Sequence, residues 1–109
     1  MDDIVIFHLN RVWNGKDLWE EIKHGRKTSE WRDVCKYWLK RLITRAQLQI
    51  NGTEPEYLAK FLKVHRAWFV VGYPKGNLPR LEVDITELIH HPSSSELEIK
   101  FANVKEVTA

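Results

Sequence analysis

The sequence has little cysteine and no long apolar run, and both absences exclude classes of protein. A single cysteine, Cys35, allows neither an internal disulfide nor a cysteine-rich zinc site. No apolar stretch approaches the roughly 18 residues of a membrane-spanning helix. The chain starts Met1-Asp2-Asp3, which is acidic and unlike a secretory signal. We therefore expect a cytoplasmic protein with no membrane partner, held together by ordinary packing.

Apolar side chains are plentiful, because 43% of the 109 residues are hydrophobic and 12 of them are Trp, Phe or Tyr. This content excludes a disordered or low-complexity chain. The length suits one core and is too short for two, so we expect a single domain over residues 1–109. We also expect the protein to be a monomer.

Charge is unevenly distributed, although the net charge is only +2. Between Lys23 and Arg45, eight positive residues stand against two negative ones, so this segment carries +6 and the remainder −4. A basic block of this kind is typical of a protein that binds a polyanion. A solvated helix face would give the same pattern.

Hydrophobic periodicity predicts a mixed α+β fold with the order β-α-β-α-α-β-β-β. We expect a small curved sheet or open barrel with helices packed against it. Gly25 and Asn51-Gly52 would end the first two helices, and Thr53 with Glu56 would form a capping box for the third. The expected strands are 3–9, 28–32, 64–73, 81–86 and 97–101, and the expected helices are 15–24, 33–50 and 53–62.

The strongest candidate site is the segment from Gly25 to Arg32. Glu30 and Arg32 are two residues apart on an expected strand, so they share a face and can form an ion pair that fixes the guanidinium. The remaining donors of Arg32 would then meet a phosphate or a base edge. Lys27 joins this face only if the backbone after Gly25 is irregular. The alternative is a solvent-exposed polar strand with a surface ion pair.

Other residue types are weaker candidates. Trp31, Tyr37, Trp38 and Trp68 could stack on bases, although we expect most of them in the core. Cys35 lies on the apolar side of the expected helix 33–50, which predicts a buried thiol. The five histidines have no metal-ligand spacing, so we predict no metal site and no cofactor.

The chain resembles the ASCH domains (activating-signal-cointegrator homology) of the PUA-like superfamily. The motif Gly25-x-Lys27-x-x-Glu30-x-Arg32 is similar to that family's G-x-K-x-x-E-x-R signature. Three further segments resemble small stand-alone ASCH proteins of microbes and phages, and the similarity runs from about residue 4 to 104. These segments are 37–42, 72–75 and 89–92. The resemblance implies a β-barrel with flanking helices and a cleft, lined by Lys27, Glu30 and Arg32, that binds RNA or a nucleotide.

The leading hypothesis is therefore an RNA- or nucleotide-binding domain, with RNA the favoured partner. Its binding residues would come from the motif and from the basic helix that follows. They are Gly25, Arg26, Lys27, Glu30, Arg32, Lys36, Lys40 and Arg41.

Two alternatives stay open. Some ASCH proteins hydrolyse N4-acetylcytidine with a lysine, a threonine and a distant glutamate, and others are described as nucleases. Lys27 matches that lysine, but Glu30 occupies the threonine position, and Glu82 and Glu87 are only candidates for the distant acid. In such an enzyme Lys27 would be the base or nucleophile and Glu30 its partner. The other alternative is a protein-interaction domain whose basic face meets an acidic partner.

Overall fold

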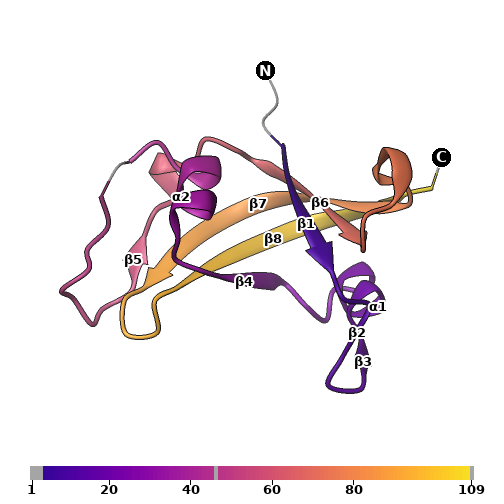
Figure 1. Ribbon diagram of the computed structural model, residues 1–109, viewed down its shortest axis with the longest axis horizontal. Helices are drawn as coiled ribbons and strands as arrows, with labels where there is room; N and C mark the ends of the chain where they lie inside the picture. The colour runs from indigo at the N-terminus through magenta and orange to yellow at the C-terminus, as the bar shows by residue number, and fades with distance from the viewer. Residues whose placement is uncertain (1–3, 46, 109) are drawn as a thin grey trace.

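A computed structural model describes residues 4–45 and 47–108, and it shows a strongly curled sheet with short helices at its ends (Figure 1). The two α-helices, α1 and α2, have six and seven residues. In chain order the elements are β1 (Ile4–Leu9), β2 (Val12–Trp13), β3 (Lys16–Asp17), α1 (Leu18–Lys23), β4 (Ser29–Asp33), α2 (Lys36–Leu42), β5 (Glu56–Tyr57), η1 (Ala59–Phe61), β6 (Arg66–Val71), η2 (Lys75–Asn77), β7 (Arg80–His91) and β8 (Glu96–Val107).

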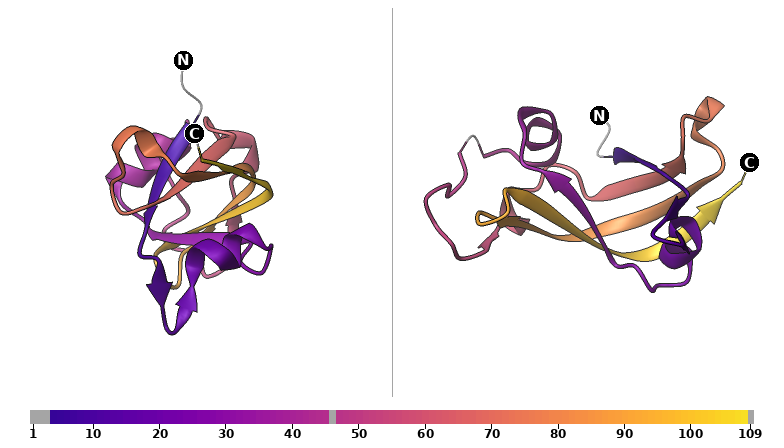
Figure 2. Two further views of the ribbon diagram at one scale, coloured as in Figure 1. Left: turned by 90° about the vertical axis from the view of Figure 1, so that its right-hand side faces the viewer. Right: turned by 60° about the horizontal axis from the view of Figure 1, so that its bottom comes forward.

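The main sheet has the strand order β1-β6-β7-β8-β4, with β5 paired to β7. β1 runs parallel to β6, whereas the other pairs are antiparallel. The β7–β8 register shifts twice, between Glu82 and Asp84 and between Ile85 and Glu87. Such bulges bend strands and increase their twist. Seen end-on, the sheet curls into a half-barrel that brings its edge strands β1 and β4 toward each other (Figure 2, left).

The core fills the inside of this half-barrel, because apolar residues alternate with polar ones along the strands. On β7, Leu81, Val83 and Ile85 are buried. The rings of Phe7 and Phe69 stack at a centroid distance of 5.3 Å. α1 adds Trp19 and Ile22, and α2 adds Leu42. The prediction of a mixed α+β fold built on a curved sheet is confirmed. Within residues 4–45 and 47–108, no helix has the length and apolarity needed to cross a membrane.

The predicted helix over residues 15–24 starts later than expected. Asn14 and Gly15 both have positive φ, 51° and 75°, and they form the turn of a β2–β3 hairpin. Asp17, not Asn14, is the N-cap of α1, where its carboxylate accepts a hydrogen bond from Glu20 N. Hydrogen bonds from the Glu20 amide and Arg11 lower the pKa of Asp17 against the opposing effect of burial.

The predicted helix over residues 33–50 is wrong at both ends, because Asp33 lies in β4 and α2 covers only Lys36–Leu42. Residue 46 of this prediction lies outside the described residues. Ile43 forms an isolated antiparallel bridge with Leu62, and Thr44 N donates to Phe61 O at 2.9 Å. These contacts pull the chain into an extended path. The predicted helix over residues 53–62 is also wrong, because Glu56 lies in β5 opposite His90 and only η1 is helical.

Candidate functional site

The backbone after α1 places Lys27 beside β4. Gly25 has φ +75°, which an L side chain rarely adopts, and it turns the chain out of the helix. The amides of Arg26 and Lys27 both donate to Glu21 O at 2.9 Å, which closes the end of the helix. Thr28 O then accepts a hydrogen bond from Phe101 N of β8. The backbone after Gly25 is therefore irregular, which is the condition for Lys27 to join the face of Glu30 and Arg32.

Three charged side chains of the motif form one chain of contacts. Lys27 Nζ lies 3.0 Å from Glu30 Oε1 and donates to Ser29 O at 2.7 Å. The other carboxylate oxygen of Glu30 pairs with Arg32 Nη1 at 2.5 Å. Glu30 is only 6% exposed. The predicted Glu30–Arg32 ion pair is confirmed; its carboxylate is buried, and its guanidinium is half-buried.

The guanidinium of Arg32 lies beside two aromatic rings that contact each other, one from β1 and one from α2. Its Cζ is 5.0 Å from the ring centroid of Phe7 on β1 and 5.4 Å from that of Trp38 on α2. Nη1 also donates to Trp31 O at 2.8 Å. Within the described residues, Nε and Nη2 have no hydrogen-bond acceptor. Arg32 is thus fixed in position while the three N–H donors on Nε and Nη2 stay available to a ligand.

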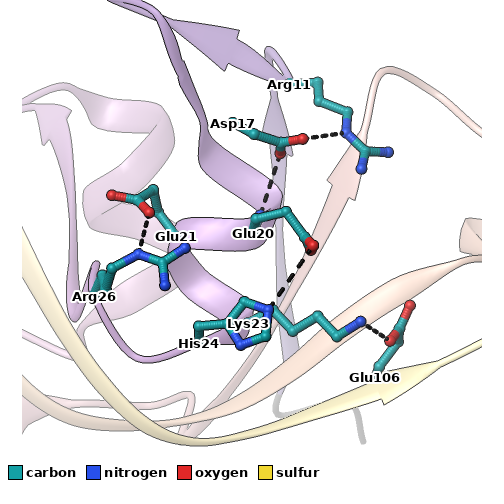
Figure 3. Close-up of polar contacts among 8 residues, drawn as sticks. All are labelled: Arg11, Asp17, Glu20, Glu21, Lys23, His24, Arg26 and Glu106. Carbon is teal, nitrogen blue, oxygen red and sulfur yellow. Dashed lines mark hydrogen bonds and ion pairs between the residues drawn. The ribbon is translucent and has the colours of Figure 1, made fainter.

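A cavity of about 370 Å³ lies next to this cluster, where β4 starts and α1 meets β8. Most of its walls are exposed residues, so it opens to solvent. Lys23 is held at 2.9 Å from Glu106, and this hydrogen bond raises the pKa of Lys23 (Figure 3). The lining residues are Lys23, His24, Gly25, Lys27, Thr28, Phe101, Ala102, Asn103 and Val104.

Arg26 does not join the cluster. Its guanidinium pairs with Glu21 on the surface of α1 (Figure 3). Arg26 would therefore contribute to a binding site only through the positive charge that it adds to the surrounding surface.

α2 follows β4 and carries the other predicted basic residues. Lys36, Lys40 and Arg41 are exposed on it. Arg41 Cζ lies 3.5 Å from the ring centroid of Tyr37, and Nη1 donates to Tyr37 O at 3.1 Å. Tyr37 meets Trp38 edge-on at 4.8 Å. The contacting rings of Tyr37 and Trp38 therefore connect Arg41, on the exposed face of α2, to Arg32.

The expectation that most of the four candidate aromatics are core residues is wrong. Trp31 and Tyr37 are exposed, and Trp38 and Trp68 are half-buried. Trp31 points away from Glu30, to the outer face, where it stacks on His91 at 4.9 Å. Cys35 was predicted to be buried but is exposed at the N-cap of α2, because the helix starts after it.

The two acids proposed as distant partners of Lys27 have other contacts. Glu82 pairs with Arg80 at 2.8 Å, and Glu87 accepts a hydrogen bond from Leu88 N. Among the described contacts, neither reaches Lys27. The described residues also contain no group of three or more His, Cys, Asp or Glu side chains placed to hold a metal ion.

One polar cluster has no counterpart in the sequence predictions. Glu56 pairs with Arg45, accepts a hydrogen bond from Gln49 N at 2.8 Å, and lies 3.3 Å from Nδ1 of the buried His90. Burial raises the pKa of the Glu56 carboxyl, but these hydrogen bonds and the Arg45 charge outweigh it and the pKa is lowered. Because Thr53 and Glu56 fit the pattern of a capping box, Glu56 was predicted to cap a helix, and its contacts with Arg45 and His90 were not predicted.

Comparison with known proteins found no matching family model, no matching curated protein and no matching solved structure.

Proposed function

We propose that this chain is an ASCH-type domain with a PUA-like fold that binds RNA or a nucleotide at the cavity beside Lys27, Glu30 and Arg32. The observation that carries the proposal is the contact chain that Lys27 and Arg32 form around the buried carboxylate of Glu30. The Glu30 carboxylate pairs with both cations and holds them in fixed positions, and one of them, Lys27, lines an open cavity. Fixed cations with spare donors suit a phosphate or a base edge, because little side-chain entropy is lost on binding.

The exposed face of α2 supplies positive charge that attracts the phosphate backbone of an approaching RNA. Lys36, Lys40 and Arg41 follow the cluster directly and have no acidic partner in the described contacts. Cations on such a surface bind the phosphate backbone without reading sequence. RNA is favoured over duplex DNA because an open cavity of this size accepts one unstacked nucleotide, which single-stranded RNA offers in its loops.

The test is the fluorescence anisotropy of a labelled RNA hairpin with an unpaired loop, over a salt series at fixed pH. We expect binding whose affinity falls steeply with salt. Lys27→Ala should weaken it roughly 10- to 100-fold, which corresponds to one charge-assisted hydrogen bond. The matched control is Lys75→Ala, because Lys75 is exposed in η2. An equal effect of both variants, or no binding at low salt, would contradict the proposal.

The structure favours a binding domain over the nucleoside hydrolase. A hydrolase needs a cavity that excludes water around the reacting bond, whereas this one is lined mostly by exposed residues. Both oxygens of Glu30 are also engaged by cations. Release of acetate from N4-acetylcytidine at high protein concentration would reverse this preference.

A further inference from the structure

The β2–β3 hairpin is a rigid projection at the start of α1. Its two-residue turn has positive φ at Asn14 and Gly15, which is the type I′ geometry that matches strand twist. Leu18 N donates to Arg11 O at 2.6 Å, and Arg11 Nε pairs with Asp17 at 3.0 Å (Figure 3). The tip extends away from the rest of the molecule (Figure 2, left). The hairpin is therefore fixed at its base and free at its tip.

Two large apolar side chains are exposed on this short hairpin. Val12 is 64% exposed and Trp13 is 60% exposed. Trp13 is directly opposite Lys16 in the register, and Val12 is opposite Asp17. Cross-strand partners share a face and successive residues alternate. One face of the hairpin therefore carries an indole beside an ammonium group, and the other carries Val12.

We propose that Trp13 and Lys16 form a second RNA contact, in which an unpaired base stacks on the Trp13 indole and Lys16 binds the adjoining phosphate. This inference rests on the proposed function. Stacking on an aromatic ring beside a cation is the usual way to hold single-stranded nucleic acid without reading its sequence. A stable protein interface buries about 800 Å² on each partner. One indole and one lysine are too small for that but large enough for one nucleotide.

The position of the hairpin fits an RNA that also occupies the cavity. Lys23 and His24 line the cavity at the far end of α1. A six-residue helix is about 9 Å long, and the paired two-residue strands of the hairpin add about 7 Å. The tip is thus within reach of an RNA several nucleotides long, but not of a mononucleotide bound in the cavity.

The experiment compares two probes, labelled dodecauridylate and uridine monophosphate, against matched hairpin variants. Trp13→Ala should weaken dodecauridylate binding roughly 5- to 150-fold, which corresponds to the loss of one stacked base. Val12→Ala, which removes an equally exposed apolar group from the opposite face, should change affinity less than two-fold. Uridine monophosphate binding should be the same for both variants. Trp13→Phe should restore most of the lost affinity, and Lys16→Ala should lower the salt slope by about one.

Several results would overturn the inference. Equal dodecauridylate affinities for Trp13→Ala and Val12→Ala would do so, and so would an unchanged salt slope for Lys16→Ala. If Lys27→Ala still weakens the binding of both probes, the proposed function stands even though the hairpin inference fails. If the wild-type protein binds neither probe at low salt, both proposals fail. A wild-type dimer that Trp13→Ala converts to a monomer in sedimentation would assign the hairpin to self-association instead.

Discussion

Replacing Glu30 by Gln should destabilise the protein far more than the same change at an exposed ion pair. The substitution keeps the shape of the side chain but removes the charge that Lys27 and Arg32 share. Removing one partner of a fully buried ion pair costs about 3–5 kcal/mol. The side chains of Lys27 and Arg32 are 23% and 22% exposed, so solvent screens part of the uncompensated charge. We therefore expect a loss of about 2–3 kcal/mol in the free energy of unfolding.

Urea denaturation followed by tryptophan fluorescence measures this loss. With a slope of about 1.5 kcal/mol per molar urea, the midpoint should fall by roughly 1.3–2 M. The control is Glu106→Gln, because the Lys23–Glu106 pair has side-chain exposures of 38% and 31%. Exposed pairs contribute about 0–1 kcal/mol. If Glu30→Gln lowers the midpoint no more than Glu106→Gln, then Glu30 does not hold the two cations, and the reasoning fails.

Three further predictions concern the rest of the molecule. Glu56→Gln should lower the free energy of unfolding by about 1–3 kcal/mol at pH 7. The folded pKa of Glu56 is lowered below 4.5, so its carboxylate stabilises the fold above that pH. This benefit is lost as pH falls through the folded pKa, so urea titrations at successively lower pH should show the cost of the substitution shrinking. The double variant Lys36→Glu/Lys40→Glu should weaken RNA binding and flatten its salt dependence without changing thermal stability, and an unchanged salt slope would remove α2 from the RNA-binding surface. Cys35 should react fully with a maleimide in the folded protein, as mass spectrometry would show, whereas slow labelling limited by unfolding would mean that the thiol is buried.

The sequence predicted the main strands and the motif geometry because both depend on local patterns. Alternation along residues 28–32 placed Glu30 and Arg32 on one face, and the structure shows their ion pair. The position of Lys27 depends on the backbone conformation at Gly25, which sequence spacing alone does not determine. The contact of Arg32 with Phe7 is set by the curl of the whole sheet, and no short-range pattern reports it.

The helices were predicted less well because tertiary contacts override helical periodicity. Residues 43–50 have helical spacing, but Ile43 is paired with Leu62 and the amide of Gln49 is hydrogen-bonded to Glu56. The hairpin did have a local signal that was missed. Asn14-Gly15 is the dipeptide preferred in type I′ turns, and strands of only two residues were too short to show alternation.

The most direct test of the proposed binding site is a ¹H–¹⁵N NMR titration of the labelled protein with a short single-stranded RNA. The proposed function predicts the largest shift changes at the Gly25, Lys27 and Thr28 amides and at the Arg32 Nε–H signal, which has no acceptor among the described residues. The same titration of Lys27→Ala should saturate at much higher RNA concentration. An RNA site at this cavity would be contradicted if these signals do not shift, or if they shift equally in Lys27→Ala.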